Sequence, residues 1–216
     1  MSPPLPMTEA PIKRDGRKEN ASATQAALQS AALRWFSEQG FEKAPVGSIC
    51  ADAGVTVGAL YHHYGDKKGL FAAVVEQVDA QLVHAAMAAS QAVIEKGGDA
   101  WDAFLASIDT VLQAGTNAPM RRLMLVDAPA VLGAQVWGDI RQRQGLGAMR
   151  GSIASIQAHG IFQGHDAERL ARIVLGALYG GMDSLPDDEA GVQDALADTR
   201  QCLVAMLEGL RNRDAR

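Results

Sequence analysis

The sequence predicts an all-α fold, and two observations support this class. The 216 residues are 48% hydrophobic but only 5% aromatic, and the abundance of Ala and Leu favours helices, because these residues head the helix-propensity ranking. Apolar residues also recur at helical spacing along most of the chain, whereas strand-like alternation of useful length and internal repeats are both missing.

The N-terminal third predicts an arm and one helix. Residues 1–19 are rich in proline and then in Lys and Arg, which indicates a flexible basic arm. Residues 21–39 place apolar side chains on one helical face, and Gly40 has the residue type that commonly ends a helix.

Two short helices are expected next. Pro45 suits the first turn of a helix that ends near Ala53-Gly54, because its missing N–H costs nothing there. Thr56 can cap a second short helix from Val57 to about Tyr64. Gly54 sits where the connecting turn needs a positive φ.

The rest of the chain predicts longer helices. Asp66 can cap a helix that continues to about residue 96, where Gly97-Gly98 stops it. A break is expected near residues 127–129, which include a proline, and another is possible at 145–151. The further helical ranges are 101–112, 120–126, a region that continues to 159, 166–184 and about 188–212.

Composition and charge limit the function classes. Residues 13–70 carry eight Lys or Arg against six Asp or Glu, whereas residues 71–216 carry twelve against eighteen. The first third is therefore mildly basic and the remainder acidic. Cys50 and Cys202 show no disulfide spacing, and no signal peptide or run of 18 uncharged apolar residues is present. A cytoplasmic protein without a membrane partner is expected.

Residues 46–64 have the spacing of a helix-turn-helix, whose second helix enters the major groove of DNA. Small and short side chains can approach base edges, while Tyr, His and Lys donate to phosphate oxygens. At the start of the following helix, backbone N–H groups also favour an anion. The candidate DNA-binding residues are Thr56, Val57, Gly58, Ala59, Tyr61, His62, His63, Lys67 and Lys68.

The stretch 27–70 resembles the N-terminal domain of the TetR/AcrR family of transcriptional regulators. The family motif is matched by Gly40-Phe41, Ile49, Ala53, Gly54, Val55, Gly58, Leu60, Tyr61, His63, Lys67 and Leu70. Four departures stand out: Cys50 replaces the usual Ala, Thr56 the usual Ser, Tyr64 the usual Phe, and Ala44-Pro45 a hydroxyl-bearing pair.

The resemblance implies three parts: the arm 1–19, a DNA-binding domain at 20–65, and a helical effector-binding and dimerisation domain at 66–216. It implies a homodimer on a palindromic operator, with repression as the family default and release by a small hydrophobic effector. Large or flexible apolar side chains suit such a cavity, although most of them are ordinary core. The candidates are Trp101, Phe104, Met124, Trp137, Tyr179 and Met182.

Other classes have weaker support. The alternative is a small-molecule binding or interaction protein with a degenerate helix-turn-helix, favoured by the acidic balance of residues 71–216 and by the missing hydroxyl at 44–45. No nucleophile elbow, Walker loop or His-Glu-x-x-His motif is present, so no enzyme activity, cofactor or metal is expected. His62 and His63 point apart on a helix and do not suggest zinc.

Overall fold

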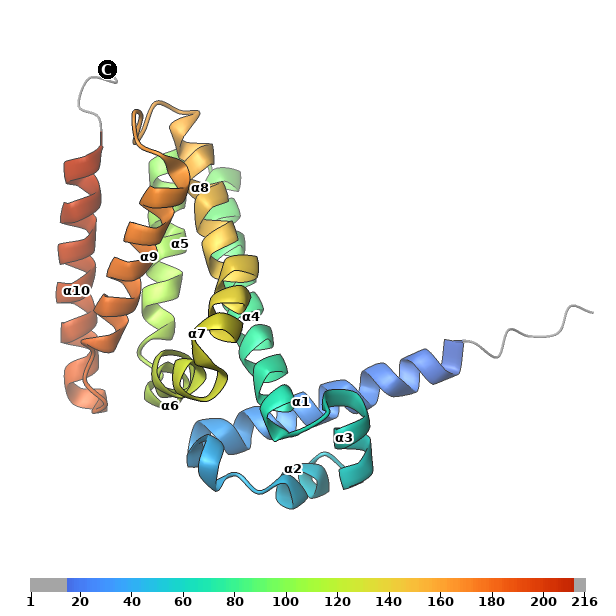
Figure 1. Ribbon diagram of the computed structural model, residues 1–216. Coiled ribbons are helices and arrows are strands. Elements are labelled where there is room, and N and C mark those ends of the chain that lie inside the picture. Colours follow the sequence, from blue (N-terminus) through green and yellow to red (C-terminus); the bar gives the residue numbers. More distant parts are fainter. Residues whose placement is uncertain (1–14, 212–216) are drawn as a thin grey trace, which may run out of the picture.

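The computed structural model describes the backbone of residues 15–211, and the regular elements in that part of the chain are all helical (Figure 1). Residues 1–14, most of the expected arm, lie outside the described residues. The elements are α1 (Asp15–Lys43), α2 (Val46–Asp52), α3 (Val57–Tyr64), α4 (Lys67–Glu95), α5 (Ala100–Ala114), α6 (Ala118–Arg122), η1 (Leu123–Asp127), α7 (Ala128–Arg141), η2 (Gln142–Leu146), α8 (Gly147–Gln157), α9 (Ala167–Asp183) and α10 (Glu189–Leu210).

The first three helices form a small unit at one end of the molecule, and α4 rises from it into a bundle with α5, α8, α9 and α10 (Figure 1). Helix α1 begins at Asp15, so residues 15–19, expected to belong to the arm, are helical. The helix is interrupted at Gly40, where φ is +79° and ψ is 164°, as its sequence position predicted.

The apolar side chains gather in two clusters. The first joins α1, α2 and α3 to the first half of α4 and to η1 and α7, and within it the rings of Phe36 and Phe71 meet edge to face at 5.0 Å. The second lies among α5, α8, α9 and α10 and contains Phe104 and Phe162, whose centroids are 5.9 Å apart. Helix α4 therefore belongs to the core of the small unit and continues beyond it along the bundle.

The segment from Ala118 to Gln157 differs from the prediction. The break expected at 127–129 does not occur: the chain passes through the π-helical segment η1, in which Ala128 N–H donates to Leu123 O. The wider turn accommodates Pro129 within the following helix. The interruption lies at Gly133 instead, with φ +79°. Near the second suspected break the chain forms η2 and continues as α8.

The run of 40 residues from Ala118 to Gln157 is long and apolar enough to cross a membrane. Helices of folded domains can have the same length and hydropathy, and this one is divided by two π-helical segments and packs against α1, α4 and α9. These contacts indicate a helix of the bundle.

Candidate functional site

The connection between α2 and α3 is a tight turn held by local hydrogen bonds. Gly54 has φ +66°, the left-handed conformation expected from the sequence. Val55 N–H donates to Cys50 O at 3.0 Å, which closes the turn. Trp35 Nε1 donates to Asp52 Oδ2 at 2.8 Å and ties the end of α2 to α1. The turn therefore fixes the direction of α3 relative to α2.

Helix α3 is held by one buried side chain and presents its other faces to solvent. Thr56 caps it as predicted, because its hydroxyl accepts from Ala59 N–H at 3.2 Å. Leu60 is fully buried, whereas Val57 is 42% and Tyr61 51% exposed. Large apolar and aromatic side chains left exposed on one helix indicate a surface for a partner.

The basic and imidazole side chains around α3 differ in their freedom. His62 is exposed and His63 half-buried, and their rings meet edge to face with centroids 5.3 Å apart, so the expectation that they point apart is wrong. Lys68 is exposed at the start of α4. Lys67 donates to the Glu42 carbonyl at 3.2 Å and lies over the Phe41 ring, so its ammonium group is already engaged within the protein.

The departures from the family motif have clear positions. Pro45 stands at the N-cap of α2, where no side chain provides a capping hydrogen bond, and Ala44 is fully buried. Cys50 is buried between the helices. Tyr64 is half-buried and its hydroxyl donates to the Gln25 carbonyl at 3.3 Å, so this ring mainly fills the junction between helices.

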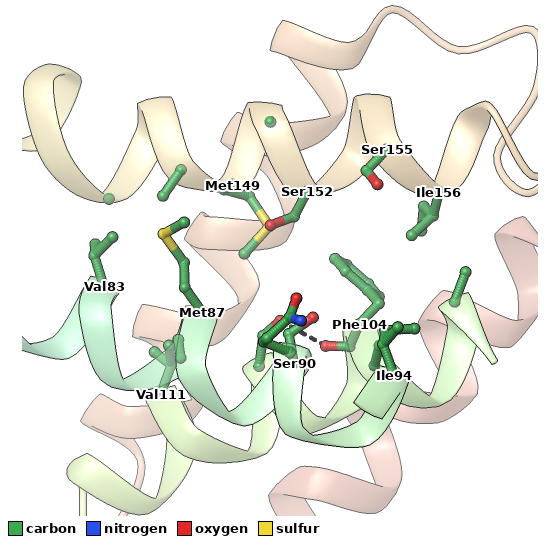
Figure 2. Close-up of a pocket in the computed structure, with 18 of the residues that line it drawn as sticks. Val83, Met87, Ser90, Ile94, Phe104, Val111, Met149, Ser152, Ser155 and Ile156 are labelled. Carbon is green, nitrogen blue, oxygen red and sulfur yellow. Dashed lines mark hydrogen bonds between the residues drawn. The ribbon is translucent and has the colours of Figure 1, made fainter. Parts of the chain in front are cut away.

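A cavity of about 790 Å³ lies between α4, α5 and α8 (Figure 2). Helix α3 lies in the small unit at the other end of α4 (Figure 1). One wall is the face of α4 that carries Val83, Met87, Ser90 and Ile94, and the opposite wall is α8 with Ser152 and Ser155 (Figure 2). Its remaining lining is mainly apolar: Leu82, Ala86, Ala100, Ala103, Phe104, Val111, Ala148, Met149, Ile156 and Leu175.

Two of the six side chains expected to bind an effector line this cavity, Phe104 and Tyr179. Trp101 and Met182 are buried in the second core cluster, outside the lining. Met124 belongs to the first cluster, and Trp137 packs against that cluster. All four have the apolar character of cavity residues, but packing between helices distant in sequence has buried Trp101, Met124 and Met182 in the cores and laid the half-buried Trp137 against the first cluster.

The sequence analysis missed the polar end of the cavity, which contains Asp79, Gly145 and Tyr179. Asp79 is 3% exposed and its Oδ2 has no hydrogen-bond partner. Burial raises the pKa of this carboxyl group to about 6, although the Gly145 backbone N–H and the charge of Arg141 oppose the shift. The available signal was an acid on an apolar stripe, with Val75 and Val83 four residues away on either side.

The geometry defines a class: a helix-turn-helix protein with an exposed second helix, joined by α4 to a helical domain that encloses a ligand-sized cavity. The comparisons agree with it. Residues 28–74 match the family of bacterial regulatory proteins known as the tetR family, and residues 101–210 match the tetracyclin repressor-like C-terminal domain. The chain therefore belongs to the TetR family of bacterial regulatory proteins.

A solved relative extends the match over nearly the whole chain. The TetR-family transcriptional regulator of Pectobacterium atrosepticum is 32% identical, with a TM-score of 0.74 over 91% of this chain and 98% of that one. The transcriptional repressor AcnR of Corynebacterium glutamicum is 24% identical over 72% of this chain and 85% of its own length.

The transcriptional regulator AcrR of Shigella flexneri matches more locally. It is 38% identical over 65 residues, which are 30% of each protein. The match to this relative spans less than a third of its length, so it carries no information about the second domain.

Proposed function

We propose that the protein is a ligand-responsive transcriptional regulator that acts in the cytoplasm as a repressor. Two copies of α3 would enter successive major grooves of a palindromic operator, and a small hydrophobic effector in the cavity would release the DNA. The relative AcnR is named a repressor, which supports repression as the effect on transcription. We propose the domain division expected from the sequence, in which residues 20–65 read DNA and residues 66–216 bind the effector and the partner subunit.

The observation that carries the proposal is the course of α4. Its first turns pack against α1 and α3, and its second half lines the cavity from Asp79 to Ile94. A ligand that changes the packing of this half therefore acts on the helix that supports α3. A coupling of ~1–3 kcal/mol between the two sites lowers operator occupancy several-fold or more.

The DNA contacts are proposed from exposure and chemistry. Val57 and Gly58 lie exposed at the first turn of α3 and suit base edges, together with Thr56 and Ala59. Tyr61, His62, His63 and Lys68 suit phosphate oxygens. A phosphate contact from Lys67 stays a prediction, because this side chain already binds Glu42 and covers Phe41.

The homodimer is proposed through the outer face of α9 and α10. Ile173 is 55% and Met206 53% exposed on these helices. Gly176 and Gly180 have open space around their Cα atoms, so another helix can approach this face closely. Pairing is needed because an operator presents its half-sites ~34–36 Å apart and each chain has one reading helix.

Fluorescence anisotropy with duplexes from the region upstream of the gene tests DNA binding. We expect affinity to fall steeply with salt, because each phosphate contact releases counterions. Tyr61→Phe, which removes one hydroxyl, should weaken binding to all duplexes similarly, whereas Val57→Ala should change the base preference. Sedimentation should show a dimer that Met206→Asp dissociates. A monomer that ignores every duplex would contradict the proposal.

One observation favours the alternative of a small-molecule binding protein with a degenerate helix-turn-helix. Helix α2 begins at Pro45 without any side-chain cap, so a hydroxyl that relatives can offer to phosphate is missing. The same anisotropy titration separates the two functions, since the alternative predicts cavity binding without salt-dependent binding of DNA.

A further inference from the structure

Asp79 is a buried carboxyl group whose hydrogen-bonding capacity is used only in part, by the Gly145 backbone N–H. It lies at the closed end of the cavity, is 97% buried, and its Oδ2 has no hydrogen-bond partner. Burying a carboxylate is unfavourable unless a donor or a cation compensates it. Because native proteins satisfy most buried polar atoms, an unpartnered oxygen on a residue that lines a cavity points to a missing donor.

Arg141, whose charge acts on Asp79, does not fill this role. The guanidinium group of Arg141 stacks on the ring of Tyr179 at 4.3 Å and lies 5.8 Å from the ring of Trp137. Among the described residues no ion pair of 4.0 Å or less includes Asp79, so Arg141 influences the carboxylate only from a distance.

Gly145 keeps space open beside the carboxylate. A Cβ atom at this position would lie 3.3 Å from Tyr179 Oη, 3.6 Å from Asp79 Oδ1 and 3.8 Å from Oδ2. A Cβ here would be tight against the Tyr179 hydroxyl and would touch the Asp79 carboxylate at ordinary contact distance. The π-helical segment η2 presents this glycine backbone to α4 and α9. The closed end is therefore a small polar compartment of Asp79, Tyr179 and Gly145.

The charged side chains that line the cavity favour a ligand with a positive charge. The lining includes two acids, Asp79 and Asp99, and one histidine, His159, whose Nδ1 lies 3.0 Å from the Ser155 carbonyl oxygen, but no Lys or Arg. An anionic head group would find no Lys or Arg partner and would meet a carboxylate at Asp79, whereas a cation would be attracted there. A carboxylate or phosphate ligand is therefore disfavoured in this cavity.

The length and apolar walls of the cavity favour a ligand with an elongated hydrocarbon part. From Asp79 to Ile94 the lining spans sixteen residues of α4, a path of ~22 Å at the rise of an α-helix. Along it Val83, Met87 and Ile94 face Ser152 and Ile156 of α8 across the space (Figure 2). Met87 is 60% exposed, so other side chains of the protein leave this part of the α4 wall largely uncovered. An elongated apolar body matches this groove, and Met side chains adapt to varied shapes.

We propose that the cavity binds an elongated lipophilic amine whose protonated nitrogen donates hydrogen bonds to Asp79 while its hydrocarbon body lies between α4 and α8. This inference rests on the proposed function in one respect: the amine is the effector class only if occupation of the cavity releases DNA. The binding itself depends only on the cavity and on Asp79.

Isothermal titration with three probes of equal chain length tests the binding: decylamine, 1-decanol and decanoate, each below its aggregation concentration at pH 7.5. The wild type should bind decylamine at least about tenfold more tightly than 1-decanol, and decanoate most weakly. Asp79→Asn keeps the shape of the side chain and should reduce the preference for the amine about tenfold or more, while binding of 1-decanol is retained.

Asp99→Asn is the matched control, because it removes the other acid of the lining but retains a good helix cap. It should leave the amine preference unchanged. Equal affinity for amine and alcohol in the wild type, an unchanged preference in Asp79→Asn, or failure of an amine series of different chain lengths to bind would each overturn the proposal.

Operator release is measured separately by anisotropy. Asp79-dependent binding of decylamine without release of DNA retains the amine site and rejects its role as effector. Release by a ligand without a basic nitrogen, unaffected by Asp79→Asn, retains the regulator and rejects the amine class.

Discussion

Substitution of Asp79 by Asn should stabilise the ligand-free protein at neutral pH. The carboxyl group has a reference pKa of 3.8 and a folded-state pKa of about 6. The folded state therefore binds the proton more tightly, and stability falls as pH rises from about 4 to about 6 and stays low above that range. A difference of about two pKa units corresponds to ~3 kcal/mol at pH 7.5, since each unit is ~1.4 kcal/mol.

Asn cannot ionise, so Asp79→Asn should unfold at a higher urea concentration than the wild type at pH 7.5. The two curves should converge near pH 4, where the wild-type carboxyl group is protonated. Measurements at fixed protein concentration from pH 4 to 8 check this, with Asp99→Asn as the control. A stability difference that is independent of pH, or a less stable variant at pH 7.5, would refute the reasoning about Asp79.

Three further outcomes are expected. Lys68→Ala should weaken operator binding for all sequences and lower the slope of log affinity against log salt by about 1, measured by anisotropy, because one phosphate contact is lost. Gly145→Ala should weaken amine binding in calorimetry, since the added Cβ would lie 3.3 Å from Tyr179 Oη. Arg122→Gln removes charge from a side chain at the end of α6 that donates to Ser37 O at 3.0 Å and pairs with Asp127. It should retain operator affinity but reduce ligand-induced release, because α6 then holds α1 less firmly.

The signals that start and stop the short helices were readable from the sequence. Thr56 accepts from Ala59 N–H and Asp66 accepts from Gly69 N–H, each within three residues of the chain. The turn at Gly54 needs a conformation that glycine adopts without strain. Because these interactions join near neighbours, residue type alone predicts them.

The course of residues 118–157 was predicted less well. Pro129 suggested a break, but the preceding π turn accommodates it and the interruption occurs at Gly133. Helix ends depend on hydrogen-bond register as well as on residue type, and the register of a π turn is set by packing against α1 and α4. No local pattern of residues specifies that packing.

The sequence by itself determined the all-α class, the helix-turn-helix and the exposed residues of α3, because helical periodicity and caps act over a few residues. Only the tertiary structure decided where the cavity lies and which apolar side chains line it. Phe104 and Trp101 are three residues apart and both belong to the second core cluster, yet only Phe104 also lines the cavity. Which side chains line the cavity depends on how α4, α5 and α8 pack. Asp79 becomes a candidate ligand-binding residue only because the fold brings Gly145, 66 positions away, beside it.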